Sequence, residues 1–221
     1  MNGSGLNGAT RRRAIRALAG VCLAGGALFG WMGTLVDHGA TGLDRRAFAA
    51  LATESGSFLA RAAHPLAIIG PVVTGALVLV VIAWLARRRC WLAAMGIVAG
   101  YLFVALLAHL AKAAEQRPRP AGALIDAGGY SFPSTESALV VGLIAIAVVA
   151  AGQAKHRRRR IGVISAAGLL TGVVGTLLVS IRVHYLTDVF AGWGMGAAVF
   201  AACGLTALAI ELRQERTATQ L

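Results

Sequence analysis

The chain has 221 residues, of which 57% are hydrophobic and 14% charged, and its mean hydropathy is +0.73. Apolar stretches of about twenty residues alternate with short charged runs, a pattern that is typical of a polytopic helical membrane protein and excludes a soluble globular domain. The formal charge of +12 would favour a nucleic-acid partner in a soluble chain, but most arginines here lie at the ends of apolar stretches. They therefore act as topology signals, and no nucleic-acid partner is expected.

The hydropathy pattern predicts an all-α fold of six transmembrane helices. Residues 1–13 are expected to form a disordered cytoplasmic N-terminus, residues 14–211 a single six-helix domain, and residues 212–221 a cytoplasmic tail. The first apolar run resembles a signal peptide but is too long and lacks a clean cleavage site, so we expect it to be retained. The six spans are expected at about 14–36, 63–86, 90–111, 134–154, 161–181 and 187–210.

Basic runs indicate how the six spans are oriented in the membrane. If all six spans cross, the arginine runs at 11–16, 87–89 and 157–160 fall on one side, together with Arg213 and Arg216. By the positive-inside rule this side is cytoplasmic, so both termini are expected in the cytoplasm of a plasma-membrane protein. Three loops then meet on the extracytoplasmic face, at 37–62, 112–133 and 182–184.

The first of these loops, residues 37–62, mixes apolar residues with charged ones. It predicts either a helix that lies in the membrane interface or an irregular linker. The three cysteines, Cys22, Cys90 and Cys203, lie in or beside apolar runs and have no metal-ligand spacing. Neither a disulfide nor a zinc site is therefore expected.

The segment from His184 to Asp188 is the strongest candidate for a catalytic site. On a helix, residues four apart share one face, so the Asp188 carboxylate is placed to accept a hydrogen bond from one ring nitrogen of His184. This bond would fix the tautomer of the ring and leave its other nitrogen free as a base or nucleophile.

Several residues on the same predicted face suit a phosphate group. Arg119 offers a planar fork for two phosphate oxygens and Lys112 a point charge; a basic cluster that touches lipid headgroups is the alternative. Ser134 follows Pro133 at the start of an apolar run and is expected to cap a helix whose first amides face the anion. Glu136 in the first turn either complements the helix dipole or takes part in catalysis.

Three motifs resemble those of the type 2 phosphatidic acid phosphatase superfamily: K-x6-R-P at 112–120, P-S-x-x at 133–136 and H-x3-D at 184–188. The resemblance covers roughly residues 63–194 and implies a membrane lipid phosphatase that needs no metal or other cofactor. It implies that His184 attacks phosphorus and forms a phosphohistidine, while Asp188 orients the ring.

The second motif departs from the family pattern. The resemblance implies that Lys112, Arg119, Ser134 and backbone amides near Thr135 hold the phosphate oxygens. The family usually reads P-S-G-H, whereas this chain has Thr135 and then Glu136. The family's histidine protonates the leaving oxygen, and a carboxylic acid can do so only if desolvation raises its pKa against the nearby cations.

The third motif departs as well. The family pattern S-R-x5-H-x3-D places its serine and arginine at Leu177 and Leu178, so one phosphate ligand is missing. Arg182 lies four residues after Leu178 and, if the helix continues, it shares that face one turn, about 5.4 Å, further along. We therefore expect Arg182 to replace the missing arginine; an interfacial arginine is the alternative.

The sequence thus predicts a phosphatase that acts on a lipid phosphate or diphosphate in the outer leaflet, with this lipid and the bilayer as its expected partners. Polyprenyl diphosphate, phosphatidic acid and phosphatidylglycerol phosphate are the candidate substrates. One alternative is a catalytically impaired family member that binds phosphorylated lipid, and another is a non-enzymatic membrane assembly protein. A transporter is disfavoured because no acidic residue falls within the spans except at their outer ends.

Overall fold

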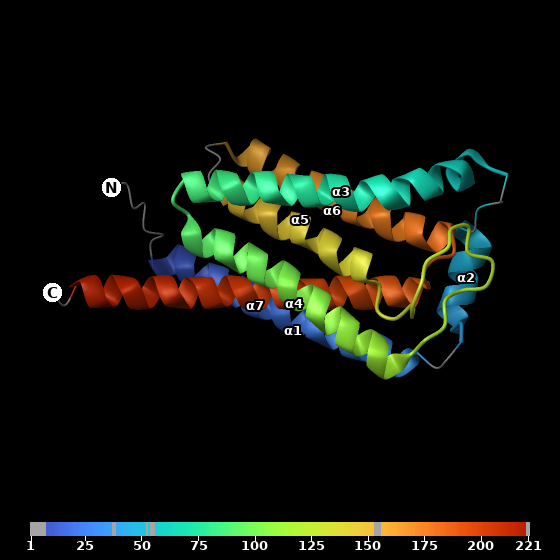
Figure 1. Ribbon diagram of the computed structural model, residues 1–221. Coiled ribbons are helices and arrows are strands. Elements are labelled where there is room, and N and C mark those ends of the chain that lie inside the picture. The colour runs from blue at the N-terminus through green and yellow to red at the C-terminus, as the bar shows by residue number, and fades with distance from the viewer. Residues whose placement is uncertain (1–7, 37–38, 52, 54–55, 153–155, 220–221) are drawn as a thin grey trace.

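The computed structural model describes residues 8–36, 39–51, 53, 56–152 and 156–219. These residues form helices and connecting loops and contain no strand. In Figure 1 the long helices form one bundle, with the short helix α2 across one end. In chain order the helices are α1 (Gly8–Leu35), α2 (Gly42–Leu51), α3 (Phe58–Arg87), α4 (Trp91–Glu115), α5 (Thr135–Gly152), α6 (Arg157–Ser180) and α7 (Leu186–Thr219).

The long helices have the length and composition of membrane spans. Over the described residues, α1, α4, α5, α6 and α7 are long and apolar enough to cross a bilayer, and α3 contributes the shorter apolar stretch Val72–Arg87. About twenty residues of helix span a hydrocarbon core roughly 30 Å thick. The all-α membrane fold with six long helices, predicted from hydropathy, is confirmed.

The two ends of the chain are more helical than the sequence suggested. α1 already begins at Gly8, so residues 8–13, which were expected in the disordered N-terminus, form its first turns. α7 continues to Thr219, beyond the expected end of the last span near residue 210. An ion pair between Arg11 and Glu215, with 2.8 Å between Nη2 and Oε1, joins the two extended ends.

The described part of the segment 37–62 contains the helix α2, where the sequence left a helix or an irregular linker open. In α2 the residues Asp44 and Ala47 are buried, whereas Leu43 and Leu51 are exposed. The buried face of α2 lies against α6 and α7. This packing places α2 directly over the start of α7, where the candidate site lies.

α7 is the central helix and contacts α1, α2, α4, α5 and α6. Its alternate glycines allow close approach on two sides, because a side chain at any of them would collide with a neighbouring backbone. A Cβ atom at Gly194 would lie 2.7 Å from the carbonyl oxygen of Gly25 in α1. On the other side, Gly192 packs on the carbonyl of Ser134 and Gly196 on that of Ala138. These contacts hold the start of α5 next to the first turns of α7.

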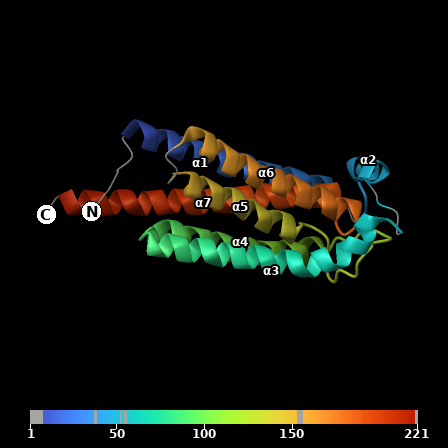
Figure 2. The same cartoon turned by 90° about the horizontal axis from the view of Figure 1, so that it is seen from above.

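The loops that carry the candidate residues gather at one end of the bundle. The segments 116–134 and 181–185 lie beside α2, and the first turn of α1 and the last turn of α7 lie at the opposite end (Figures 1 and 2). The turn between α3 and α4, with Arg87 to Arg89, is also at the opposite end. The basic runs and the polar site are therefore separated by the length of the bundle.

Candidate active site

His184 lies in the turn between α6 and α7. α6 ends at Ser180, and the backbone amides of Val183 and His184 both donate to the carbonyl of Leu178, at 3.1 and 3.3 Å. The His184 side chain is wholly buried. Its ring is therefore held by a hydrogen-bonded turn rather than by a helix.

Asp188 meets His184 as predicted, although through a different geometry. Because α7 begins at Leu186, the two residues do not share a helical face. Asp188 instead reaches back from the first turn: its Oδ2 accepts the backbone amide of Tyr185 at 2.9 Å and lies 3.5 Å from Nδ1 of His184. The first contact resembles the carboxylate half of a capping box. The second is longer than a well-formed hydrogen bond, and such catalytic contacts commonly tighten when substrate binds.

Glu136 faces the other nitrogen of the His184 ring. Its Oε2 lies 3.1 Å from Nε2 of His184, and the hydroxyl of Ser134 donates to the same oxygen at 3.5 Å. The Glu136 side chain is 48% exposed, whereas that of His184 is fully buried. Glu136 therefore lies on the open side of the nitrogen that would act as nucleophile.

Two carboxylates determine the protonation of His184. Burial alone disfavours the charged imidazolium, but the contacts with Asp188 and Glu136 and the charges of these groups outweigh it, so the pKa of His184 is raised above its ordinary value. Burial disfavours the Glu136 carboxylate, but its contact with His184 and the charges of His184 and Lys112 lower the pKa of Glu136 to about 2. Desolvation therefore does not raise this pKa, and the proton of the resting pair lies on Nε2 of His184.

The start of α5 is built as the sequence predicts. The Ser134 hydroxyl accepts the backbone amide of Ser137 at 3.2 Å, which is the hydrogen bond of an N-cap. The backbone amide of Ser134 donates to the carbonyl of Asp188 at 3.1 Å and so ties the cap to α7. Thr135 opens the helix and is partly exposed. The N-terminal amides of α5 thus lie near the His184–Asp188 pair.

Arg119 also lies beside the reactive nitrogen. Its Nη1 donates to the carbonyl of Val183 at 2.9 Å and lies 3.3 Å from Nε2 of His184, and its Nη2 donates to the carbonyl of Gly128 at 2.9 Å. Lys112 is placed differently, because its ammonium donates to the carbonyl of Tyr130 at 2.7 Å. Arg119 is therefore at the reaction centre, and Lys112 joins α4 to the loop beside it.

Arg182 does not share a helical face with Leu178. α6 ends before it, at Ser180, and Arg182 has a left-handed φ of 58°. Its Nη1 lies towards Gly122, where an added Cβ would be 3.3 Å away. The helical argument for Arg182 is wrong because the chain turns before that residue, and its role as a phosphate ligand stays a prediction.

Arg117 and Asp44 are the site residues that the sequence analysis missed. Arg117 is wholly buried; it donates through Nη1 to Asp188 and Thr187, and through Nη2 to Asp44 at 2.8 Å. In the sequence it is one of several arginines in a basic loop, and Asp44 is 73 positions away. Its position two residues before Arg119 of the first motif was a weak signal for a site residue. That position did not reveal its buried carboxylate partners.

The donor set suits an anion more than a cation. In the part of the chain that the structure describes, no group of three or more His, Cys, Asp or Glu side chains is placed to hold a metal ion. The Arg119 guanidinium and the Glu136 carboxylate contact Nε2 of His184, and the Ser134 hydroxyl and the first turn of α5 lie beside Glu136. The guanidinium, the hydroxyl and the helix-start amides are donors to phosphate oxygens.

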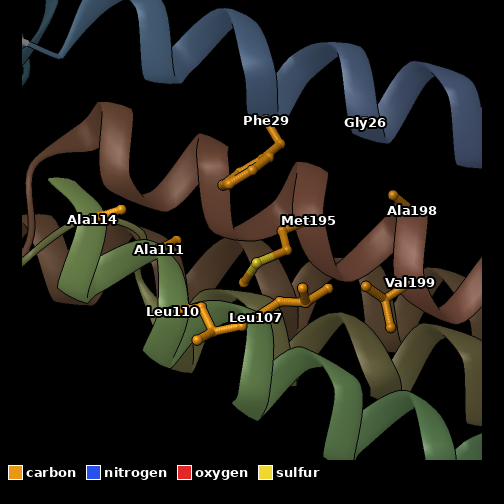
Figure 3. Close-up of a pocket in the computed structure, with 9 residues that line it drawn as sticks. All are labelled: Gly26, Phe29, Leu107, Leu110, Ala111, Ala114, Met195, Ala198 and Val199. Carbon is orange, nitrogen blue, oxygen red and sulfur yellow. The ribbon is translucent and has the colours of Figure 1, made fainter.

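An apolar groove runs along the membrane-spanning part of the bundle. Figure 3 shows the part of it nearer the site, a cavity of about 400 Å³ between α1, α4 and α7, lined by residues such as Phe29, Leu107 and Met195. A second cavity of about 440 Å³ continues between α4 and α7 and shares Leu107 and Val199 with the first. Phe29, which lines this first cavity, stacks on Phe132 of the loop before Ser134, with 6.0 Å between ring centroids.

The fold and the site define a helical membrane protein in which a buried histidine–aspartate pair lies among phosphate donors. The profile of the PAP2 superfamily matches residues 93–208, more than half of the chain. The chain belongs to the PAP2 superfamily, which confirms the resemblance carried by the three motifs. No curated protein matches the chain.

One solved structure supports the fold. The transmembrane PAP2-type phosphatidylglycerolphosphate phosphatase from Bacillus subtilis is similar, with a TM-score of 0.63 and 19% identity, and the match covers 88% of this chain and 94% of that chain. At this identity the likeness shows the fold alone. Together with the family it supports a lipid phosphatase in the broad sense.

Proposed function

We propose that the chain hydrolyses a lipid phosphate or diphosphate through a phosphohistidine on His184. The observation that carries the proposal is the buried His184 ring, which has Asp188 at one nitrogen and both Glu136 and Arg119 at the other. A nucleophile held between an orienting carboxylate and a proton carrier is the arrangement that covalent catalysis requires.

Glu136 is assigned the proton transfers. In the resting pair the proton on Nε2 of His184 passes to the Glu136 carboxylate, which frees the nitrogen lone pair to attack phosphorus. As the N–P bond forms and the bond to the leaving oxygen breaks, Glu136 returns that proton to the leaving oxygen. In the second half, the carboxylate takes a proton from the attacking water, the P–O bond forms and the P–N bond breaks.

The cations and the start of α5 are assigned to the phosphate oxygens. Arg119 already lies 3.3 Å from Nε2 and can bind two oxygens of the transferring group. Ser134 and the amides near Thr135 offer further donors, with Lys112 and Arg182 at the edge of the site. These groups would stabilise the charge that develops in the transition state.

The apolar groove supports a lipid substrate. It begins beside the loop that precedes Ser134, and its walls are formed by apolar side chains of α1, α4 and α7 (Figure 3). The hydrocarbon chain of a lipid whose phosphate lies at His184 is proposed to lie along this groove. The bilayer and such a lipid are therefore the proposed partners.

A binding protein without turnover is the second candidate. The Glu136 carboxylate occupies the space next to Nε2, where its charge would oppose an incoming phosphate unless it carries a proton. The arginine of the third family motif is also absent, since Leu178 takes its position. Both features would lower turnover more than they lower lipid binding.

The site is proposed to face the extracytoplasmic side of the plasma membrane, with both termini in the cytoplasm. Supporting this orientation, the ends of α1 and α7 and the run from Arg87 to Arg89 share one end of the bundle, opposite to the site (Figure 1). The positive-inside rule makes that end cytoplasmic.

Purified protein in detergent tests the activity. It is expected to release phosphate from members of a panel of lipid phosphates and diphosphates in the presence of EDTA, to be inhibited by vanadate, and to form an acid-labile phosphoprotein with ³²P-labelled substrate. His184→Ala is expected to abolish both phosphate release and labelling while still eluting as a folded monodisperse species. If no substrate of the panel is hydrolysed but lipid phosphates still bind, the second candidate holds.

A further inference from the structure

Arg117 connects α2 to the base of the candidate active site. Its guanidinium donates through Nη1 to the Oδ1 of Asp188 and through Nη2 to Asp44 at 2.8 Å. All three side chains are wholly buried. A charged group in such a place is retained only when its partners are held in good geometry, because removal of one partner leaves another charge buried and unpaired.

Asp44 is held by more donors than Arg117 alone. Its Oδ1 accepts the amide and the hydroxyl of Thr187, at 2.9 and 3.0 Å, and its Oδ2 accepts the amide of Thr41 at 2.9 Å. Burial opposes ionisation of this carboxyl, but these hydrogen bonds outweigh it, so the pKa of Asp44 lies below its ordinary value. Asp44 is therefore an anion that fixes the far side of the Arg117 guanidinium.

The position of the guanidinium is also fixed by an aromatic ring. The Cζ atom of Arg117 lies 3.8 Å from the centroid of the Tyr185 ring, the residue directly after His184. A planar guanidinium that is stacked on a ring and bound at both of its Nη atoms has little freedom to move. The Oδ1 atom of Asp188 accepts a hydrogen bond from Arg117, and Oδ2 accepts one from the Tyr185 amide. These two bonds fix the orientation of the carboxylate towards His184.

We propose that Arg117 and Asp44 are positioning residues of the phosphatase reaction, which hold Asp188 for His184 and balance the charge behind it. The proposal rests on the proposed function for the role of the His184–Asp188 pair. It also gives α2 a role, because Asp44 of this helix binds Arg117, which in turn binds Asp188. Neither residue touches the reacting atoms.

The two residues are predicted to act on His184 in opposite directions. Arg117 adds a positive charge behind Asp188 and so weakens the hold of this carboxylate on the imidazolium, whereas Asp44 offsets that charge. Loss of Arg117 is expected to favour protonated His184, and loss of the Asp44 charge to favour the neutral ring. The charged and titratable groups around His184 in the described structure are Glu136, Arg119, Lys112 and Asp188, with Arg117, Asp44 and Tyr185 behind Asp188.

The test measures the pH dependence of kcat/KM for Arg117→Met, Asp44→Asn and wild type. The rate is expected to fall at high pH as the His184–Glu136 pair loses the proton that the leaving oxygen needs. This fall should move to higher pH in Arg117→Met and to lower pH in Asp44→Asn, each by about one pH unit. Arg46→Met is the matched control. Arg46 is an exposed residue of α2, the helix that carries Asp44, and its substitution removes the same charge as Arg117→Met. This control should superimpose on wild type.

An NMR titration of the His184 ring in detergent, assigned by comparison with His184→Ala, compares the pKa of His184 in wild type and the same variants and does not require turnover. If the wild type is inactive but the ring titrations still move in opposite directions, the proposed function fails and the positioning by Arg117 and Asp44 stands. Shifts in the same direction, or no difference from Arg46→Met, would overturn the positioning. Should Arg117→Met not fold, Arg117→Lys replaces it: it keeps the charge but cannot bind both carboxylates, so its profile should stay in place while kcat falls at least tenfold.

Discussion

Glu136 occupies the place where the family usually has a histidine, and its contact with His184 gives a testable pH effect. Glu136 raises the pKa of His184, and only the neutral ring can attack phosphorus. In Glu136→Gln no carboxylate can take the ring proton, so His184 must lose it to solvent before attack and kcat/KM should rise with pH. In wild type kcat/KM should instead fall at high pH, as the His184–Glu136 pair loses the proton that the leaving oxygen needs. The maximal rate should also fall by roughly a hundredfold or more, because the proton carrier is lost.

The leaving group separates the two effects of this substitution. A nitrophenyl phosphate, whose leaving oxygen needs little protonation, should lose far less rate in Glu136→Gln than an alkyl or lipid phosphate does. An equal loss for both substrates would show that Glu136 does not protonate the leaving group. An unchanged pH profile would show that its charge does not act on His184.

The site residues differ in how far the sequence could reveal them. His184, Asp188, Ser134 and Arg119 could be found because they belong to short motifs with fixed spacing. Arg117 could not, since its role depends on a carboxylate 73 positions earlier in the chain, brought to it by the packing of α2. The geometry of Arg182 depended on where a helix ends, and helix ends are the least predictable part of a pattern.

Close contact between helices rests on small residues, and the pair Gly25 and Gly194 gives a prediction for stability. In Gly194→Ala the new methyl would lie 2.7 Å from the Gly25 carbonyl oxygen, so α1 and α7 must separate. Overpacking of this kind costs about 1–3 kcal/mol. Thermal unfolding in detergent, followed by tryptophan fluorescence, should show a lower midpoint.

Gly30 of α1 provides the matched control for this substitution. A Cβ atom at Gly30 meets nothing within 4 Å, and the residue is exposed. Gly30→Ala should therefore leave the midpoint unchanged or raise it slightly, because alanine is the better helix former by about 1 kcal/mol. Equal destabilisation by both substitutions would contradict a specific contact at Gly194.

The groove between α1, α4 and α7 predicts a dependence on hydrocarbon length. Leu107 lines both cavities of the groove, so Leu107→Trp should obstruct it at their junction. Each methylene displaced from an apolar site costs about 0.8 kcal/mol, so the loss of two raises KM by roughly tenfold. KM should rise for long-chain lipid phosphates and stay unchanged for a water-soluble short-chain analogue.

Leu106→Trp is the control for the groove, because Leu106 is a neighbouring exposed residue of α4 that does not line either cavity. It should leave both KM values as in wild type. An equal effect of Leu107→Trp on long and short substrates would place the hydrocarbon chain elsewhere.

At the level of the whole molecule, the fold follows from hydropathy and charge because each acts over many residues. Apolar stretches long enough to cross a bilayer predict the long helices, and these lie within a few residues of their expected positions except at the chain ends. At these ends the Arg11–Glu215 pair joins α1 and α7 beyond their apolar parts. A local sequence pattern does not predict such a contact between distant residues.

The same arginine runs predict the orientation of the whole molecule. In a variant with the three native cysteines replaced by serine, Asp126→Cys places a thiol in the exposed loop of the site, and Arg158→Cys places one at the opposite end of the bundle. If arginine-rich ends stay in the cytoplasm, a membrane-impermeant maleimide should label the first thiol on intact cells and the second only after permeabilisation. Labelling at residue 158 but not at residue 126 on intact cells would reverse the orientation and place the hydrolysis on the cytoplasmic leaflet.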